Sequence, residues 1–281
     1  MRRLLSANFL WLKKSPLFRG TVILGFVVGA VFAFRNFMDQ VEYERAGYVY
    51  SFSMDGLFFR YVLLAGIAMA MFIPLFFGTE YDDGTIRNKL VVGHFRLSIY
   101  FANLITATAA AFAFCGAYML GALAVGAPLL GWFEMPLSTF LLFLAGTLVT
   151  TAAFAALYTL ITMAFTRKAA AAVVCVMAIF GMLASSFTFY TKLEAAEYIT
   201  GYSLTSDGEY LANDPTPNPK YLQGEKRKVY QFLYDFTPGG QAMQYANMET
   251  GNVMLLSVYS IVVFTVCTVT GNMMFRKKDL K

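Results

Sequence analysis

Residues that could carry out chemistry are few, and their spacing fits no common catalytic or metal-binding motif. His94 is the only histidine, and no second metal ligand lies at a usable spacing from it. Cys115, Cys175 and Cys267 all lie within apolar stretches. This placement predicts that they are small buried hydrophobic residues. Metalloprotease and serine-hydrolase motifs are also missing. The sequence therefore indicates no catalytic residue, no metal ligand and no cofactor-binding residue.

Hydrolysis of ATP through a phosphate-binding loop is excluded on the same grounds. The run G-x-x-x-x-G-K-[S/T], whose glycines and lysine hold phosphate groups, does not occur anywhere in the sequence. We therefore predict that the chain is not an enzyme, and we look to the elements that its residues build.

Apolar residues dominate the composition and fall into long blocks. Of the 281 residues, 58% are hydrophobic and 14% are charged, and the mean hydropathy is +0.57. Soluble domains are closer to half apolar and a quarter charged. The net charge of +5 comes largely from basic residues beside the apolar blocks, which suits a membrane surface rather than nucleic acid. The composition predicts a single membrane domain, residues 1–281, in contact with a lipid bilayer.

Six apolar blocks are long enough to cross a bilayer, which takes about 20 helical residues. The predicted spans are residues 17–34, 57–77, 99–125, 137–165, 169–190 and 252–275. Residues 1–16 form a short basic segment, with Leu5, Phe9 and Leu12 on one helical face and a break at Pro16. The predicted fold class is an all-α membrane protein with six transmembrane helices and an N-terminal amphipathic helix in the membrane interface.

The distribution of basic residues predicts the orientation. When the N-terminus is placed inside, fourteen of the 22 Lys and Arg residues fall on inner segments, and the short outer loops carry three. The positive-inside rule then places both termini and the loop 78–98 in the cytoplasm. Residues 191–251 become an extracytoplasmic segment between spans five and six, with helices predicted over 225–236 and 241–249.

The inner loop 78–98 carries charges of both signs around a predicted helix. Asp83-Gly84 is a turn signal, and the helix is expected over residues 85–92, with Ile86 and Leu90 on one face and Arg87 on another. A helix of this kind suits docking into a groove of a partner. The alternative is a solvated loop without a partner, which is the common state of charged loops.

Hydroxyl groups form a stripe along span four. Thr147, Thr151, Tyr158 and Thr162 share one helical face and could line a pathway for an amphipathic substrate. The alternative is packing between helices through hydroxyl hydrogen bonds, which is also the expected role of Gly25-x-x-x-Gly29 in span one.

The run GTEYDDGTIRNKLVVGHFRLSIYFANL, residues 78–104, closely resembles the first cytoplasmic loop of bacterial type-2 ATP-binding-cassette (ABC) permeases. The basic N-terminal helix, the six spans and the long segment before the last span fit the same family. The resemblance implies that this loop holds a cytoplasmic coupling helix. It implies an ATPase-docking role for Glu80, Asp82, Asp83, Ile86, Arg87, Lys89 and Leu90, and a secondary contact through Arg167 and Lys168.

The family resemblance also implies a function and partners. The chain would be the permease subunit of an ATP-driven exporter in a bacterial cell membrane, paired with a second permease chain, identical or related. A separate ATPase subunit would bind ATP and Mg. Amphipathic or antimicrobial peptides are the implied class of substrate. One alternative is an ABC-type sensor or scaffold that transmits a signal. Another is an ATPase-independent carrier, which the few ionisable residues in the spans disfavour.

Overall fold

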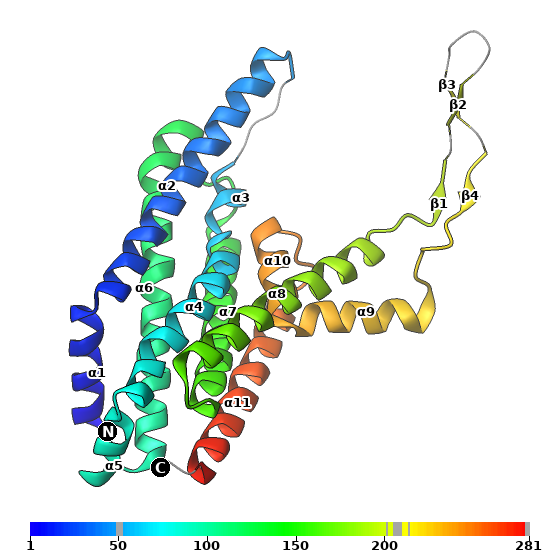
Figure 1. Cartoon of the computed structure of the whole chain (residues 1–281). Coiled ribbons are helices and arrows are strands. Elements are labelled where there is room, and N and C mark those ends of the chain that lie inside the picture. Colours follow the sequence, from blue (N-terminus) through cyan, green and yellow to red (C-terminus); the bar gives the residue numbers. More distant parts are fainter. Residues whose placement is uncertain (49–52, 201, 205–209, 213, 279–281) are drawn as a thin grey trace.

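The computed structural model describes residues 1–48, 53–200, 202–204, 210–212 and 214–278, and helices make up nearly all of it (Figure 1). Six helical segments are long and apolar enough to cross a membrane, so the protein is a multi-pass helical membrane protein. They are α2 (Pro16–Arg45), α3 and α4 together (Met54–Phe58 and Tyr61–Asp82), α6 (Arg96–Leu130), α7 (Leu137–Ala164), α8 (Lys168–Leu193) and α11 (Val253–Lys277).

The six predicted spans and the N-terminal helix are confirmed. Helix α1 (Arg2–Lys14) ends at Ser15, whose hydroxyl accepts a hydrogen bond from the Phe18 backbone and so caps α2. Figure 1 shows α1, the short helix α5 (Thr85–Val91) and the end of α11 at one end of the molecule. We call this the inner end, and an even number of spans brings both chain termini to it.

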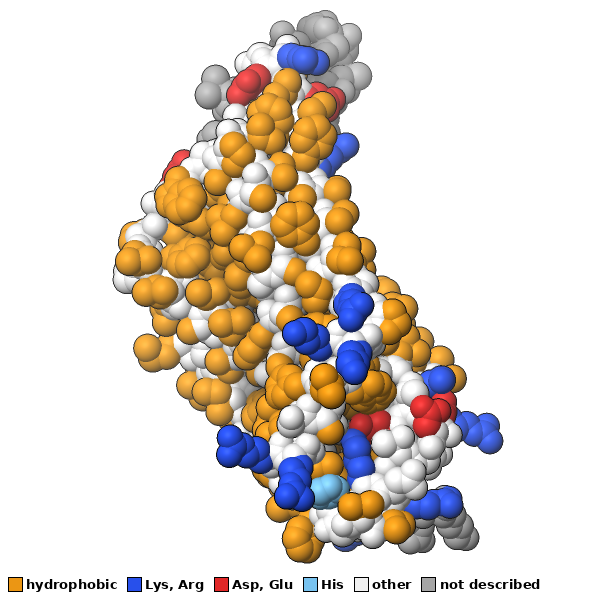
Figure 2. Space-filling model, turned by 90° about the vertical axis from the view of Figure 1, so that its left-hand side faces the viewer, with side chains coloured by type: hydrophobic (Ala, Val, Ile, Leu, Met, Phe, Trp, Pro, Cys, Tyr) orange, Lys and Arg blue, Asp and Glu red, His pale blue; other side chains and the backbone are white. Residues whose placement is uncertain are grey.

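Helix α2 differs from its prediction in length. The helix continues beyond the apolar block to Arg45 and projects past the neighbouring spans (Figure 1). Its 30 residues give a rod of about 45 Å, which exceeds a hydrocarbon core of about 30 Å. Apolar side chains cover most of the face in Figure 2, and basic side chains gather toward its lower part. This pattern is the one expected of a lipid-facing surface with a polar end.

Helices α2 and α6 pack closely through glycines. A Cβ on Gly29 would collide with the carbonyl oxygen of Tyr118, and one on Gly121 would collide with that of Phe26. A Cβ on Gly25 would press against Phe114. The predicted packing role of Gly25-x-x-x-Gly29 is therefore confirmed, and its partner is α6 of the same chain.

The stretch 191–251 divides into two parts that lie in different places. Strand β1 (Tyr198–Ile199) pairs with β4 (Thr216–Pro217), and β2 (Tyr202–Leu204) pairs with β3 (Tyr210–Ala212), both antiparallel, in an arm that projects away from the helices (Figure 1). The arm is followed by helices α9 (Gly224–Phe236) and α10 (Pro238–Asn247). Helix α10 packs against α4, α7 and α8, so this part of the predicted outer segment lies among the spans.

Candidate functional site

Helix α5 lies at the inner end and follows α4 through a tight turn. Gly84 adopts a φ of 66°, which lets the chain reverse between Asp83 and Thr85 at no steric cost. The helix predicted over 85–92 is observed over Thr85–Val91. Its short length makes it dependent on packing for stability, so the contacts of its side chains decide its orientation.

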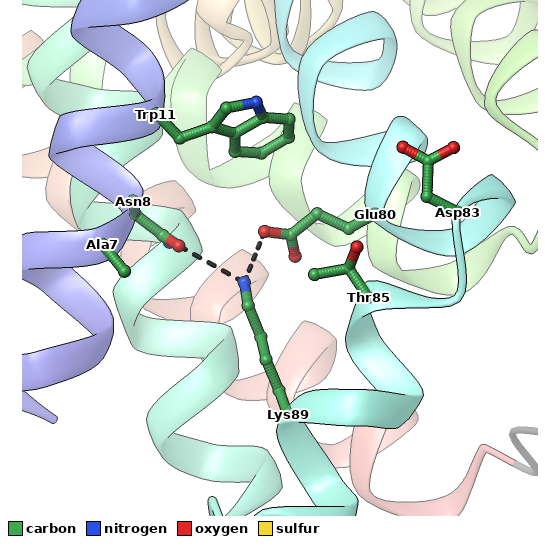
Figure 3. A pocket seen from close by; sticks show the side chains of 7 residues that line it. All are labelled: Ala7, Asn8, Trp11, Glu80, Asp83, Thr85 and Lys89. Atoms are coloured by element: carbon green, nitrogen blue, oxygen red, sulfur yellow. Dashed lines mark hydrogen bonds and ion pairs between the residues drawn. The ribbon is translucent and has the colours of Figure 1, made fainter.

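A buried set of polar side chains joins α5 to three other helices. We call Asn8 of α1, Glu80 of α4, Lys89 of α5 and Asn103 of α6 the inner polar network. Lys89 forms an ion pair with Glu80 and donates a hydrogen bond to Asn8 Oδ1 at 3.3 Å (Figure 3). Asn103 donates to Glu80 Oε2 at 3.1 Å, and Asn8 donates to Asn103 Oδ1 at 2.7 Å. Both Glu80 carboxylate oxygens therefore have a partner.

Apolar contacts surround the network. Ile86 is only 1% exposed and belongs to the core of the chain, and Leu90 is half-buried against it. The Trp11 ring stacks on Phe76 with centroids 4.0 Å apart and lies above Lys89 in Figure 3. The space between α1, α4 and α5 is a cavity of about 290 Å³. The face of α5 that was expected to meet a partner is thus turned toward its own chain.

A different set of residues is exposed around the C-terminal end of α5. Val91, Val92 and Phe95, which we call the apolar tip, are 80%, 77% and 79% exposed. Arg87 is exposed nearby in sequence, and His94, between Val92 and Phe95, is half-buried. Exposed apolar side chains outside the predicted spans are candidates for contact with a partner protein or with the membrane surface.

The remaining docking candidates lie at the edge of the same end. Asp82 and Asp83 are exposed, and the Asp82 carboxylate pairs with Lys168 at 3.2 Å. Lys168 also lies against Gly78, where a Cβ would meet the Lys168 Cα at 2.8 Å. Arg167 is exposed beside it. The structure therefore brings the two predicted contact regions together, and their docking role stays a prediction.

Lys278 fixes the end of α11 to this assembly. Its Nζ donates hydrogen bonds to the carbonyl oxygens of Met163 and Phe165, at 2.9 and 2.7 Å, and lies 4.0 Å from the ring centroid of Tyr81. Burial lowers the pKa of the Lys278 ammonium to about 8, although the carbonyl groups and the ring favour its charged form. The inner end is thus a connected surface of α4, α5, α7, α8 and α11.

The hydroxyl stripe of span four lies buried between helices. Thr147 contacts the Tyr61 hydroxyl at 2.5 Å, Thr151 lies 3.8 Å from Cys115 Sγ, and Tyr158 donates to the Gly66 carbonyl at 2.9 Å. Thr162 donates to the carbonyl of Tyr158. These bonds to α4 and α6 match the packing alternative, and a pathway role for the stripe stays a prediction.

No local pattern in the sequence indicates the residues that complete the inner polar network. Asn8 and Asn103 are single amides in apolar surroundings, and only the contact of α1 with α6 brings them together. The apolar tip had a visible signal, because Val91, Val92 and Phe95 are apolar residues outside every predicted span. Comparisons with protein-family models, curated proteins and solved structures found no match to the chain.

Proposed function

We propose that this protein is the membrane-spanning subunit of an ATP-driven ABC exporter that works as a dimer with a separate ATPase subunit. The observation that carries the proposal is the apolar tip, Val91, Val92 and Phe95, exposed at the inner end. The resemblance of residues 78–104 to the first cytoplasmic loop of type-2 ABC permeases supports the same partner. The missing phosphate-binding loop requires that ATP and Mg be held by that partner.

The tip has the properties of a docking element. Buried apolar side chains hold most interfaces together, while charges at the rim steer the approach. Val91, Val92 and Phe95 supply the apolar part, and Arg87 supplies a rim charge. The inner polar network fixes the other face of α5 to α1, α4 and α6. A push on the tip would therefore reach three helices, as coupling between distant sites requires.

The proposed exporter function includes a second permease chain and a class of substrate. Six helices per chain enclose little space, and a second permease chain would double that number. An amphipathic or antimicrobial peptide is the substrate class that the family resemblance favours. The projecting arm, β1 to β4, gives the sensor or scaffold alternative its own support, because an extended arm at the far end from α5 suits contact with an external protein (Figure 1).

The test co-expresses the tagged permease with a candidate ABC ATPase chain, sought in the reading frames beside its gene, and purifies the permease in mild detergent. Phe95→Asp and Val91→Asp should each reduce recovery of the ATPase strongly, because a buried unpaired carboxylate costs about 2–5 kcal/mol. Asn88→Asp adds the same charge on exposed α5 surface without removing an apolar contact, and it should lose little.

Two outcomes would contradict the proposal. Undiminished ATPase recovery with both tip variants would show that the tip is only a solvated loop. ATP hydrolysis by the permease alone, after removal of every partner, would show that the chain is not a subunit of this kind. Peptide transport in vesicles that hold both subunits separates the exporter from the sensor or scaffold.

A further inference from the structure

The turn between α9 and α10 is hydrogen-bonded to α7 and α11. Gln241 Oε1 accepts hydrogen bonds from Ser260 Oγ at 2.6 Å and from Thr150 Oγ1 at 3.5 Å. Thr150 is half-way along α7 (Leu137–Ala164), about 20 Å from either end. Gln241 Nε2 donates to the backbone carbonyl of Asp235 at 2.9 Å. Ser260 is seven residues, about 10 Å, from the Val253 end of α11, so the end of α9 lies beside the middle of α7 and the outer third of α11.

Asp235 is a buried carboxylate without a cationic partner. It is 9% exposed, and its Oδ1 accepts hydrogen bonds from Gln231 at 2.9 Å and from Gln244 at 3.0 Å. Among the described residues, no Lys, Arg or His side chain forms an ion pair with it. A buried charge without a partner of opposite charge is costly, so the missing cation invites a ligand that supplies one.

Asp235 opens onto a groove between α9 and α11. The groove has a volume of about 520 Å³, and we call it the α9 groove. Its lining side chains are those of Arg227, Lys228, Gln231, Phe232, Asp235 and Tyr259.

The groove carries opposite charges at its two ends and aromatic rings between them. Arg227 and Lys228 both lie about one helical turn before Gln231 and about two turns before Asp235, on the same face of α9. Asp235 is eight positions after Arg227, which is about 12 Å along the helix. Phe232 lies 5.8 Å from Tyr259, centroid to centroid, and is half exposed.

We propose that the α9 groove binds an extended segment of an amphipathic peptide. An ammonium group of the peptide would lie on the Asp235 carboxylate, and a carboxylate group would lie on Arg227 and Lys228. The exposed ion pair between Lys228 and Glu225 is worth little and yields easily to a ligand. This inference rests on the proposed function, because it names where the exporter would hold its substrate.

The geometry favours a peptide over a phospholipid. Four extended residues span about 13 Å, which matches the 12 Å between the charged ends. In a phospholipid the phosphate and the amine are separated by only a few bonds, so one headgroup cannot reach both ends. A lipid whose phosphate lay on Arg227 would also place its acyl chains against Asp235. This arrangement is unfavourable, because burying a charged carboxylate in hydrocarbon costs free energy.

The probe is a tetrapeptide with free termini, Gly-Leu-Trp-Gly, in which the leucine is replaced by photoleucine. The full-length permease is reconstituted in phosphatidylcholine nanodiscs, irradiated with the peptide and mapped by mass spectrometry. Cross-links should fall on α9 and α11. Asp235→Asn should lower their yield about tenfold or more, because a hydrogen bond to a charged group is lost. The N-acetylated peptide should cross-link weakly and to the same extent in both proteins.

Matched variants separate the groove from general charge. Lys226→Gln removes a basic residue of α9 that does not line the groove, and it should leave the yield unchanged. The double variant Arg227→Gln with Lys228→Gln should lower the cross-link yield of the peptide that has a free carboxyl terminus. It should leave the cross-link yield of the C-terminally amidated peptide unchanged. Only variants that elute from size-exclusion chromatography as a monodisperse protein, at the same volume as the wild type, are compared.

Equal yields from wild type and Asp235→Asn with the free peptide would overturn the inference. Cross-links outside α9 and α11 would also overturn it. Loss of every cross-link on adding phosphatidylethanolamine, with free and acetylated peptides alike, would show that the groove is a lipid site instead. Recovery of the ATPase by the apolar tip does not depend on peptide. A failure of the ATPase-recovery experiment can therefore be distinguished from a failure of the cross-linking experiment.

Discussion

Glu80 and Asp235 are both buried carboxylates, and their surroundings differ in one respect. Glu80 faces Lys89 and Asn103, so its charge is neutralised within the chain. Asp235 faces the amides of Gln231 and Gln244, which satisfy hydrogen bonds and leave the charge uncompensated. Glu80 is therefore suited to hold helices together, whereas Asp235 is suited to accept a cation from outside the chain.

Removal of the cation beside Glu80 should have the largest effect on stability. Lys89→Met leaves a carboxylate that is 2% exposed with Asn103 as its remaining partner. Breaking a buried ion pair in this way typically costs about 3–5 kcal/mol. We expect a loss of this size in the free energy of unfolding, measured by SDS titration in mixed micelles.

The double variant Glu80→Gln with Lys89→Met is the control for the first prediction. It removes the uncompensated charge and keeps a carbonyl acceptor for Asn103, so it should recover most of the lost stability. If Lys89→Met were as stable as wild type, Glu80 would not depend on its cation. The two carboxylates would then be alike, and the comparison would fail.

Loss of Asn8 should have an intermediate effect, localised to α1. Asn8→Ala removes a donor to Asn103 and an acceptor for Lys89, and unsatisfied buried groups cost about 1–3 kcal/mol. Because these bonds hold α1 on α6, trypsin should cleave more rapidly after Lys13 and Lys14. Ser6→Ala changes an exposed residue of the same helix and should leave cleavage unchanged. Equal cleavage of both variants would show that Asn8 does not hold α1.

The spans and α5 were predictable because their signals are local. A long apolar block predicts a span and Asp83-Gly84 predicts a turn, and neither prediction depends on contacts with the rest of the chain. The burial of Ile86 was not predictable in the same way, because either face of a seven-residue helix could turn inward. This burial also changes the choice of test: Ile86→Asp would disturb folding of the chain itself, so Val91 and Phe95 are the residues that probe docking.

The position of α10 was hidden by its composition. Gln241 and Gln244 lower its hydropathy, so a helix packed among the spans has the sequence of an outer loop. Its predicted start at residue 241 was three residues late, because Thr237 and Pro238 are a cap and a first-turn proline: the Thr237 hydroxyl accepts from Gly240 N in the structure. The hydrogen bonds to Thr150 and Ser260 depend on three helices meeting, which no local pattern reports.

The smallest stability effect should come from the second carboxylate. In Asp235→Asn the side-chain oxygen can still accept hydrogen bonds from Gln231 and Gln244, and no ion pair is broken. We expect the free energy of unfolding to change by less than about 1 kcal/mol, against several for Lys89→Met, in the same SDS titration. The variant should nevertheless lose cross-linking of the free tetrapeptide.

A loss of several kcal/mol in Asp235→Asn would contradict this prediction. The charge of Asp235 would then be part of the fold, as that of Glu80 is, and lost peptide binding would follow from damage to the α9 and α10 turn. The control is Gln244→Ala, which removes a donor to Asp235 and leaves its charge in place. If Asp235 serves the ligand, Gln244→Ala should lower stability more than Asp235→Asn and reduce cross-linking less. That reversed order would distinguish a binding carboxylate from a structural one.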